Sequence, residues 1–224
     1  MWNPRRGRIS ERSGRAGGEP VSGGGAAARE RVACLVLAAG AGRRFGPGGP
    51  KQLALLRGRP LLEHVLAQAS GSAVDRVVVV LGAGGEAILD RLDLHGAAPL
   101  ACGSWREGMS APLREGIEAV ADCDAAVVML GDQPLVTAAA VDRVLAARKS
   151  GSDATRASYG GRPGHPVVLE RRLFPAIGGL AGDAGARSLL GSGRVGTVPC
   201  DDVADPLDVD TPADLRRAEQ ALTP

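Results

Sequence analysis

The sequence has few aromatic residues, no long apolar run and no closely spaced cysteines. Aromatic side chains make up 2% of its 224 residues, too few to supply the stacking platforms of a single-stranded nucleic-acid binder. The longest apolar runs, near 77–81 and 125–130, have the length of strands, whereas a membrane span needs roughly 20 residues. The four cysteines lack the spacing of a zinc site or a redox dithiol. These absences predict a cytoplasmic protein that binds neither nucleic acid nor membrane.

The basic residues gather at the N-terminus. The formal net charge is +2, but residues 1–31 hold seven arginines and three glutamates, so the remainder of the chain is slightly acidic. Residues 1–30 are rich in glycine, arginine and serine, without apolar periodicity and without the apolar run of a secretory signal. We therefore expect a disordered tail over 1–30 and one domain over 31–224 that lacks a basic patch.

From residue 31 onward, apolar runs alternate with amphipathic segments. The runs at 32–38, 76–81 and 125–130 are almost wholly aliphatic, and helical patterns separate them. Such runs indicate parallel strands that are covered on both faces. The sequence therefore predicts an α/β fold with a doubly wound, mostly parallel sheet in three layers. Weaker patterns predict strands near 99–102, 166–169 and 195–199, and helices from 60, near 86–92, 112–120 and 137–148, and after Thr211.

A glycine-rich loop follows the first predicted strand. Residues 37–46 read Leu-Ala-Ala-Gly-Ala-Gly-Arg-Arg-Phe-Gly, and Lys51 follows. Glycines allow backbone N–H groups to approach an anion, while Arg44 and Lys51 supply the positive charge that a triphosphate requires. The P-loop pattern is absent, since Lys51 precedes Gln52 rather than Ser or Thr, and Phe45 interrupts the dinucleotide fingerprint. The loop predicts triphosphate binding at the carboxyl end of the strand, with a ligand-free glycine turn as the alternative.

Two acidic segments complement this loop. Asp132 lies in Gly-Asp-Gln-Pro after the aliphatic run at 125–130, and Asp208 and Asp210 alternate before the C-terminal helix. In an extended segment this alternation puts both carboxylates on one face. Magnesium takes one or two carboxylates and completes its shell with water and substrate phosphates. We expect Mg²⁺ at Asp132 with Asp208 or Asp210; a turn or helix-entry role for these aspartates is the alternative.

Five motifs in the same order resemble a known family over about residues 32–222. The signature at 37–51, followed by Gly-Arg-Pro-Leu-Leu at 58–62, is similar to the nucleotidyltransferases of the molybdenum cofactor type. The other four motifs resemble the molybdenum cofactor cytidylyltransferase branch: Gly-Asp-Gln-Pro-Leu at 131–135, Gly-His-Pro-Val at 164–167, Gly-Asp-x-Gly-Ala-Arg at 182–187 and Asp-x-Asp-Thr-Pro at 208–212. The resemblance implies a Rossmann-like nucleotidyltransferase fold that transfers a nucleotidyl group from an NTP to a phosphorylated acceptor.

The resemblance also implies roles for individual residues. Arg44, Lys51 and Asp132 would be catalytic, with magnesium at Asp132 and Asp208 or Asp210. Ala39 at the loop start points to CTP, and His165 and Arg187 would face a molybdopterin-type acceptor, with Arg187 a candidate for its phosphate. The remaining predicted binding residues are Ala38, Gly40 and Gly42, together with Gly108 and Ser110, whose backbone could contact the base or ribose while Trp105 packs outside. An N-cap at Ser110 explains that segment nearly as well.

The predicted reaction is attack of the acceptor's terminal phosphate on the α-phosphorus of CTP, with release of pyrophosphate. Such chemistry needs positioning and charge stabilisation more than a covalent nucleophile, and the sequence has no Ser/His/Asp set or nucleophile elbow. A molybdoenzyme or its chaperone could be a partner. Two other functions stay open: an NAD(P)H-dependent oxidoreductase of the same family acting on a heteroaromatic pigment, and a non-catalytic protein that binds or inserts molybdenum cofactor.

Overall fold

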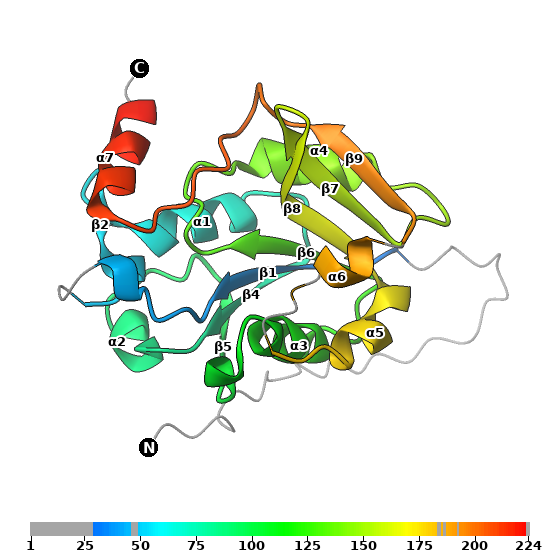
Figure 1. Ribbon diagram of the computed structural model, residues 1–224, viewed down its shortest axis with the longest axis horizontal. Coiled ribbons are helices and arrows are strands. Elements are labelled where there is room, and N and C mark those ends of the chain that lie inside the picture. The colour runs from blue at the N-terminus through cyan, green and yellow to red at the C-terminus, as the bar shows by residue number, and fades with distance from the viewer. Residues whose placement is uncertain (1–28, 46–48, 183–184, 186, 192, 223–224) are drawn as a thin grey trace, which may run out of the picture.

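A seven-stranded sheet forms the centre of the molecule. The computed structural model in Figure 1 describes residues 29–45, 49–182, 185, 187–191 and 193–222, so the predicted tail lies almost wholly outside the described residues. The strand order is β5-β4-β1-β6-β8-β7-β9, and every strand except β8 runs in the same direction. The strands are β1 (Val32–Ala38), β4 (Arg76–Leu81), β5 (Ala98–Ala101), β6 (Ala125–Leu130), β7 (Ala154–Tyr159), β8 (Arg162–Glu170) and β9 (Val195–Pro199), and a separate hairpin joins β2 (Leu55–Leu56) to β3 (Arg59–Pro60).

Helices cover both faces of this sheet. Because side chains alternate along a strand, Cys34 and Val36 of β1 face one helical layer, and Ala33 and Leu35 face the other. Figure 1 shows α1 and α4 on one side of the sheet and α3 and α5 on the other. The first layer contains α1 (Leu61–Ser70), α2 (Gly85–Leu89) and α4 (Ala138–Ala146), the second contains α3 (Ser110–Ala119), α5 (Phe174–Gly178) and α6 (Arg187–Leu190), and α7 (Pro212–Ala221) packs on the β2–β3 hairpin. The predicted three-layer, doubly wound fold is confirmed.

The sheet reverses its direction of growth between β1 and β6. The chain adds β4 and β5 on one side of β1 and then returns to place β6 on the other side. In such sheets, the crevice at the carboxyl ends of the two strands beside this reversal is where ligands bind. Gly131, directly after β6, lies so close to β1 that a Cβ atom there would be 2.7 Å from the Cβ of Ala38. The loops after β1 and β6, which carry the predicted site residues, therefore meet at this crevice.

Membrane-spanning helices and cysteines were both considered in the sequence. No helix in the described ranges is long and apolar enough to cross a bilayer. All four cysteines are buried and free, and burial raises the pKa of the Cys34 thiol to about 12. Cys34 is therefore a poor nucleophile at neutral pH.

Candidate active site

The loop after β1 is held from beneath by Gln52. The buried amide of Gln52 donates from Nε2 to the carbonyl oxygens of Ala38, at 3.0 Å, and of Gly40, at 3.1 Å. Gly42 has a φ of +58°, and a Cβ atom on it would lie 3.1 Å from Cγ of Lys51. The aliphatic stem of Lys51 thus passes directly under Gly42. Sequence reasoning missed Gln52, which carries no charge and belongs to no motif that was singled out.

Lys51 joins the two acidic segments. Its Nζ lies 2.7 Å from Oδ2 of Asp132 and 2.8 Å from Oδ1 of Asp210, and Arg44 reaches the other oxygen of Asp210 at 2.7 Å. Burial by itself lowers the pKa of Lys51, but the two carboxylates more than offset this, so the pKa lies above its ordinary value. We call Arg44, Lys51, Asp132 and Asp210 the Lys51 cluster. The structure therefore brings together predicted residues from three distant parts of the chain.

Backbone and amide contacts fix Asp210 beside Asp132. The N–H of Val209 donates to the carbonyl of Asp132 at 2.9 Å, and Nε2 of Gln133 donates to Oδ1 of Asp208 at 2.9 Å. Val209, which lies between the two aspartates, is fully buried. Partial burial and the negative charges of Asp132 and Asp210 raise the pKa of Asp208. Gln133, which the sequence did not single out, thus holds the segment that carries Asp208 and Asp210.

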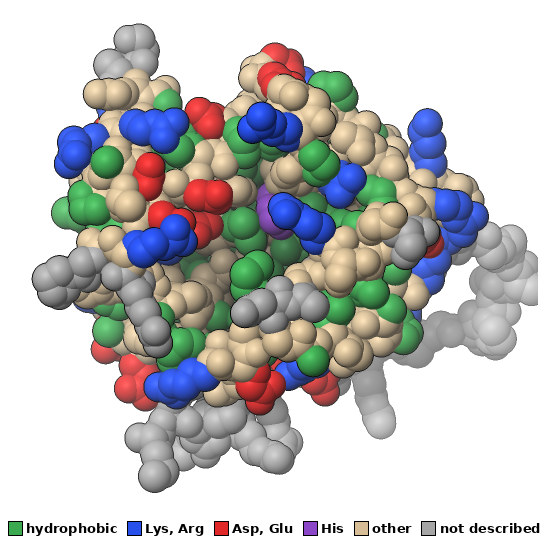
Figure 2. Space-filling model, in the orientation of Figure 1, with side chains coloured by type: hydrophobic (Ala, Val, Ile, Leu, Met, Phe, Trp, Pro, Cys, Tyr) green, Lys and Arg blue, Asp and Glu red, His purple; other side chains and the backbone are tan. Residues whose placement is uncertain are grey.

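Two adjoining cavities open at the crevice. The first has a volume of about 330 Å³ and contains the whole Lys51 cluster, while the second, of about 630 Å³, is lined by Trp105, Gly108 and Pro112. Figure 2 shows a hollow on this face with acidic side chains along one wall and basic side chains across from them. Predicted residues in the first cavity are Ala38, Gly40, Gly42, Arg44, Lys51, Asp132 and Asp210, and those in the second are Ala39, Gly40, Gly42 and Gly108.

The segment around Trp105 differs from the prediction in two ways. Trp105 does not pack outside: it is half-buried and lines the second cavity, and Arg106 stacks on it with its guanidinium carbon 4.4 Å from the ring centroid. Ser110 is not the N-cap, because Met109 takes that position and Ser110 is the first residue of α3. Ser110 is fully buried and lines neither cavity, while its N–H donates to the carbonyl of Gly182 at 3.1 Å. It therefore joins α3 to the segment that leads to Arg187.

His165 lies within electrostatic reach of Asp132 and of Arg187, but neither His165 nor Arg187 lines one of the two cavities. Burial lowers the pKa of His165 to about 4, Asp132 opposes this shift and Arg187 adds to it. The imidazole is therefore neutral at neutral pH. Arg187 is exposed at the start of α6, and Asp183, Ala184 and Ala186 of the same motif lie outside the described residues. A Cβ atom on Gly185 would lie 3.9 Å from Cε of Met109, so this segment reaches the rim of both cavities.

Asp132 and Asp210 suit a hard divalent cation. Their oxygens already share one cation, the ammonium of Lys51, so a cation between them can take a ligand from each carboxylate. Within the described ranges, no group of three or more His, Cys, Asp or Glu side chains is arranged to hold a metal ion. Magnesium needs only one or two carboxylates when water and phosphate oxygens complete its shell. The residues therefore fit Mg²⁺ bound together with a phosphate ligand.

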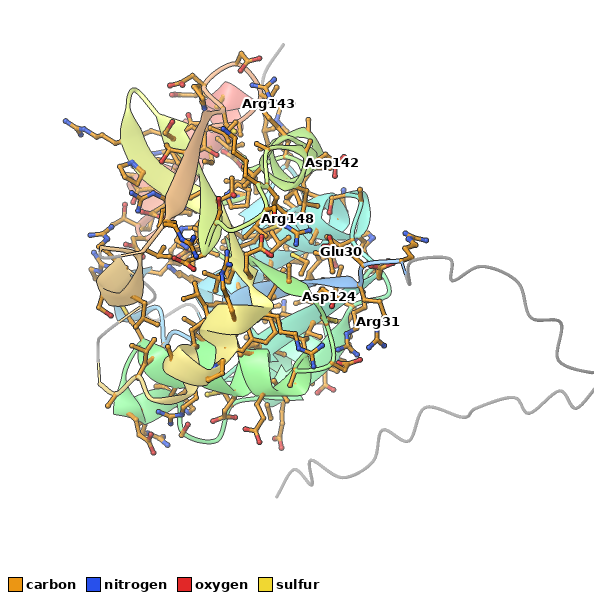
Figure 3. All side chains as sticks on the ribbon, turned by 90° about the vertical axis from the view of Figure 1, so that its right-hand side faces the viewer. Glu30, Arg31, Asp124, Asp142, Arg143 and Arg148 are labelled. Atoms are coloured by element: carbon orange, nitrogen blue, oxygen red, sulfur yellow. The ribbon has the colours of Figure 1, made fainter. Side chains whose placement is uncertain are left out.

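Another cavity of about 630 Å³ lies at the opposite, amino-terminal edge of the sheet. Arg148 lies there and is saturated by carboxylates: Nε and Nη2 lie 2.8 Å from Glu170, and Nη1 lies 2.8 Å from Glu30. Figure 3 shows Arg148 beside Glu30 at this edge. Because this cavity lies away from the carboxyl ends of the parallel strands, it is not the candidate active site.

Comparisons with known proteins agree with this arrangement. Residues 34–198 match the model of the MobA-like NTP transferase domain. The chain is 34% identical over 195 residues to nicotine blue oxidoreductase of Paenarthrobacter nicotinovorans, which covers 83% of this chain and 95% of that protein. Among solved structures, the homologue of Mycobacterium tuberculosis Rv0371c from Mycobacterium sp. strain JC1 has 33% identity and a TM-score of 0.75, covering 86% of this chain and 97% of that one.

The similar solved structures also include a complex with manganese. Rv0371c of Mycobacterium tuberculosis in complex with manganese has 30% identity and a TM-score of 0.72, covering 86% of this chain and all of that one. Because the family model matches residues 34–198, which are most of the chain, the chain belongs to the MobA-like NTP transferase family. This confirms the family of nucleotidyltransferases that the motifs predict.

Proposed function

We propose that this protein is a magnesium-dependent nucleotidyltransferase that moves CMP from CTP to a phosphorylated molybdopterin-type acceptor. A terminal phosphate oxygen of the acceptor would bond to the α-phosphorus of CTP while the bond to the β-phosphate breaks and pyrophosphate leaves. The observation that carries the proposal is that Nζ of Lys51 lies within 2.8 Å of a carboxylate oxygen of Asp132 and of one of Asp210, in a cavity shared with the glycine loop.

The charge of the site supports the need for a divalent cation. Together with Asp208, the Lys51 cluster carries two positive and three negative side chains. A triphosphate is strongly anionic, so a site with this balance binds it more weakly without a divalent cation than with one. Asp132 and Asp210 would hold the Mg²⁺, whose chemistry when bound would be to neutralise phosphate charge and to polarise the bond to the leaving pyrophosphate. Asp208, which accepts a hydrogen bond from Gln133, would help to position Asp132 and Asp210 rather than bind the ion.

The cationic residues would stabilise the charge that develops on the leaving group. Lys51 lies in the same cavity as Gly40 and Gly42, whose bare backbone lets phosphate oxygens come close. Arg44, exposed at the rim, would meet the outer phosphates. Phosphoryl-group chemistry depends mainly on such positioning and charge stabilisation, which agrees with a site built from fixed charges.

The two ends of the cleft would take different parts of the substrates. The second cavity, with Ala39, Trp105 and Gly108, suits the base and ribose of CTP. The neutral His165 and the cationic Arg187 would face the acceptor, with Arg187 toward its phosphate. Ser110 would act through the position of the α3 start, because it lines neither cavity. A cytoplasmic molybdoenzyme or its chaperone would receive the product.

A second candidate function is supported by one specific finding. Nicotine blue oxidoreductase is 34% identical to this chain, and the match covers 95% of that protein. An NAD(P)H-dependent reduction of a heteroaromatic pigment would use the more apolar second cavity, but it would give no role to the paired carboxylates of Asp132 and Asp210. A non-catalytic carrier of molybdenum cofactor would likewise not need them.

A panel of reactions distinguishes the three functions. Purified protein is incubated with Mg²⁺, a phosphorylated molybdopterin-type acceptor and CTP, GTP, ATP or UTP in turn, and pyrophosphate release is measured. Parallel reactions contain NADPH or NADH with a heteroaromatic pigment. We expect release with CTP above the other nucleotides and no oxidation of NAD(P)H. Oxidation of NAD(P)H without pyrophosphate release would favour the oxidoreductase, and acceptor binding without either reaction would favour the carrier.

A further inference from the structure

The ammonium of Lys51 stands where a divalent cation would bridge Asp132 and Asp210. Its Nζ lies 2.7 Å from one carboxylate and 2.8 Å from the other. We propose that Lys51 is an internal cation that closes this position in the nucleotide-free protein and yields it to the metal when the triphosphate binds. The proposal rests on the proposed function in taking Asp132 and Asp210 as the metal-binding carboxylates.

Burial makes Lys51 an effective competitor for this position. The Lys51 side chain is 9% exposed, whereas Arg44, which pairs with the same Asp210, is 77% exposed. Solvent screens an exposed ion pair strongly and a buried one much less. An ammonium and a divalent ion placed together between the same oxygens would also repel each other at short range. Metal entry therefore requires the ammonium of Lys51 to move, while Arg44 has little influence.

The glycine loop gives Lys51 another place to go. Its stem lies under Gly42, where a Cβ atom would come within 3.1 Å of Cγ, and both residues line the cavity of about 330 Å³. A compact ammonium on a flexible four-carbon stem can change partners by side-chain rotation alone. It can therefore turn from the carboxylates toward phosphates in the loop without leaving the cavity.

This exchange couples nucleotide and metal. A bound triphosphate gives Lys51 a new anionic partner, and the metal gives the carboxylates a new cation, so each ligand lowers the cost of binding the other. Such coupling is reciprocal. Lys51 should consequently weaken metal binding and strengthen nucleotide binding. A lysine with a purely structural role would not produce these two opposite effects.

Manganese provides a direct test, with no acceptor and no turnover. Free Mn²⁺ is measured by electron paramagnetic resonance during titration of the nucleotide-free protein, and CTP affinity is measured separately without metal. We expect Lys51→Met and Lys51→Gln to raise Mn²⁺ affinity on the order of tenfold, because a competing charge is removed, and to weaken CTP binding. Lys51→Gln keeps hydrogen-bond donors for both carboxylates, which protects folding. Arg44→Gln is the matched control and should change Mn²⁺ affinity little.

A double variant tests whether the added Mn²⁺ affinity arises at Asp132. Asp132→Asn in the Lys51→Gln background should remove the added Mn²⁺ affinity. Unchanged or weaker Mn²⁺ binding in folded Lys51 variants overturns the proposal, and so does a gain that survives Asp132→Asn. Because the Mn²⁺ titration uses neither acceptor nor catalysis, a gain in Mn²⁺ affinity with no CMP transfer would reject the proposed reaction and leave the exchange standing.

Discussion

Gly131 determines how closely the two charged loops meet. A Cβ atom there would lie 2.7 Å from the Cβ of Ala38 and 3.2 Å from the carbonyl oxygen of Leu37, so the loop after β6 touches β1 with its bare backbone. The next residue, Asp132, then comes within 2.7 Å of Lys51. Any larger residue at 131 would force the loops apart, which explains why glycine precedes the aspartate in structural terms.

At the same scale, His165 should make stability depend on pH. Its pKa is about 4 in the folded protein and 6.5 without the fold, so between these values the unfolded chain binds more protons. Acidification therefore favours unfolding: the stability contributed by the neutral imidazole is complete above pH 6.5 and is lost as the pH falls toward 4. From pH 7 to pH 5 we expect a loss of roughly 2 kcal/mol in the free energy of unfolding from this group.

Urea denaturation at a series of pH values measures this effect. His165→Asn has no titrating group at this position, so its free energy of unfolding should fall less between pH 7 and pH 5 than that of the unmodified protein. Two parallel pH curves would mean that burial does not shift the pKa of His165.

At the scale of elements, the start of α7 fixes the backbone of Asp210. The Asp214 carboxylate accepts hydrogen bonds from the N–H of Thr211, at 2.9 Å, and of Asp210, at 3.3 Å, while the Thr211 hydroxyl accepts from the N–H of Asp214. These contacts lower the pKa of Asp214, chiefly through the Thr211 side chain. The capping box of α7 is therefore also a support for the Lys51 cluster.

We expect Thr211→Ala to reduce both stability and metal binding. Loss of the cap should lower the free energy of unfolding by about 1 kcal/mol, and the freed Asp210 backbone should weaken Mn²⁺ binding. Thr137→Ala is the matched control, since the Thr137 side chain is the N-cap of α4 and accepts from the N–H of Ala140, without a capping box and without contact to the Lys51 cluster. Urea denaturation and Mn²⁺ titration of both variants give the comparison. Equal Mn²⁺ affinity in the two would show that the cap of α7 has no part in the site.

Elements with continuous apolar runs could be predicted closely. The ranges expected for β1, β4 and β6 agree with the structure residue for residue, because buried parallel strands need apolar side chains on both faces. The range expected for β9, a strand at the edge of the sheet, also agrees. β7 was missed and β8 was found only over 166–169. β7 reads Ala-Thr-Arg-Ala-Ser-Tyr, and two prolines interrupt β8. These strands depend on pairing with distant partners, such as Arg156 of β7 with Thr197 of β9, which local patterns do not reveal.

The charged part of the site could be predicted, but its supports could not. Arg44, Lys51 and Asp132 stood out because charge beside glycine or after a buried strand is costly without a purpose. Gln52 and Gln133 carry no charge and match no chemical pattern, so their hydrogen bonds to Ala38, Gly40 and Asp208 emerge only in three dimensions. The direct pairing of Lys51 with both carboxylates was likewise not expected, since spacing along the chain does not give distances between loops.

At the scale of the whole molecule, the topology concentrates charge at one edge of the sheet. Lys51 and Asp210 are 159 residues apart in the chain, yet they form a hydrogen bond of 2.8 Å, because β1 and β6 are neighbours and the segment before α7 runs back to their carboxyl ends. The hollow in Figure 2 marks this edge. Because the strand order reverses between β1 and β6, a crevice forms at the carboxyl ends of these strands, and the loops there bring the charged side chains into it.

The most direct test of the account is pyrophosphate release from CTP, with Mg²⁺ and the phosphorylated acceptor, by the unmodified protein and by Asp132→Asn. Asp90→Asn is the control, because Asp90 is exposed at the end of α2 and lines neither cavity of the site. We predict that Asp132→Asn lowers the rate at least about a hundredfold while Asp90→Asn keeps it. A rate for Asp132→Asn close to that of the control would contradict the assignment of this site to nucleotidyl transfer.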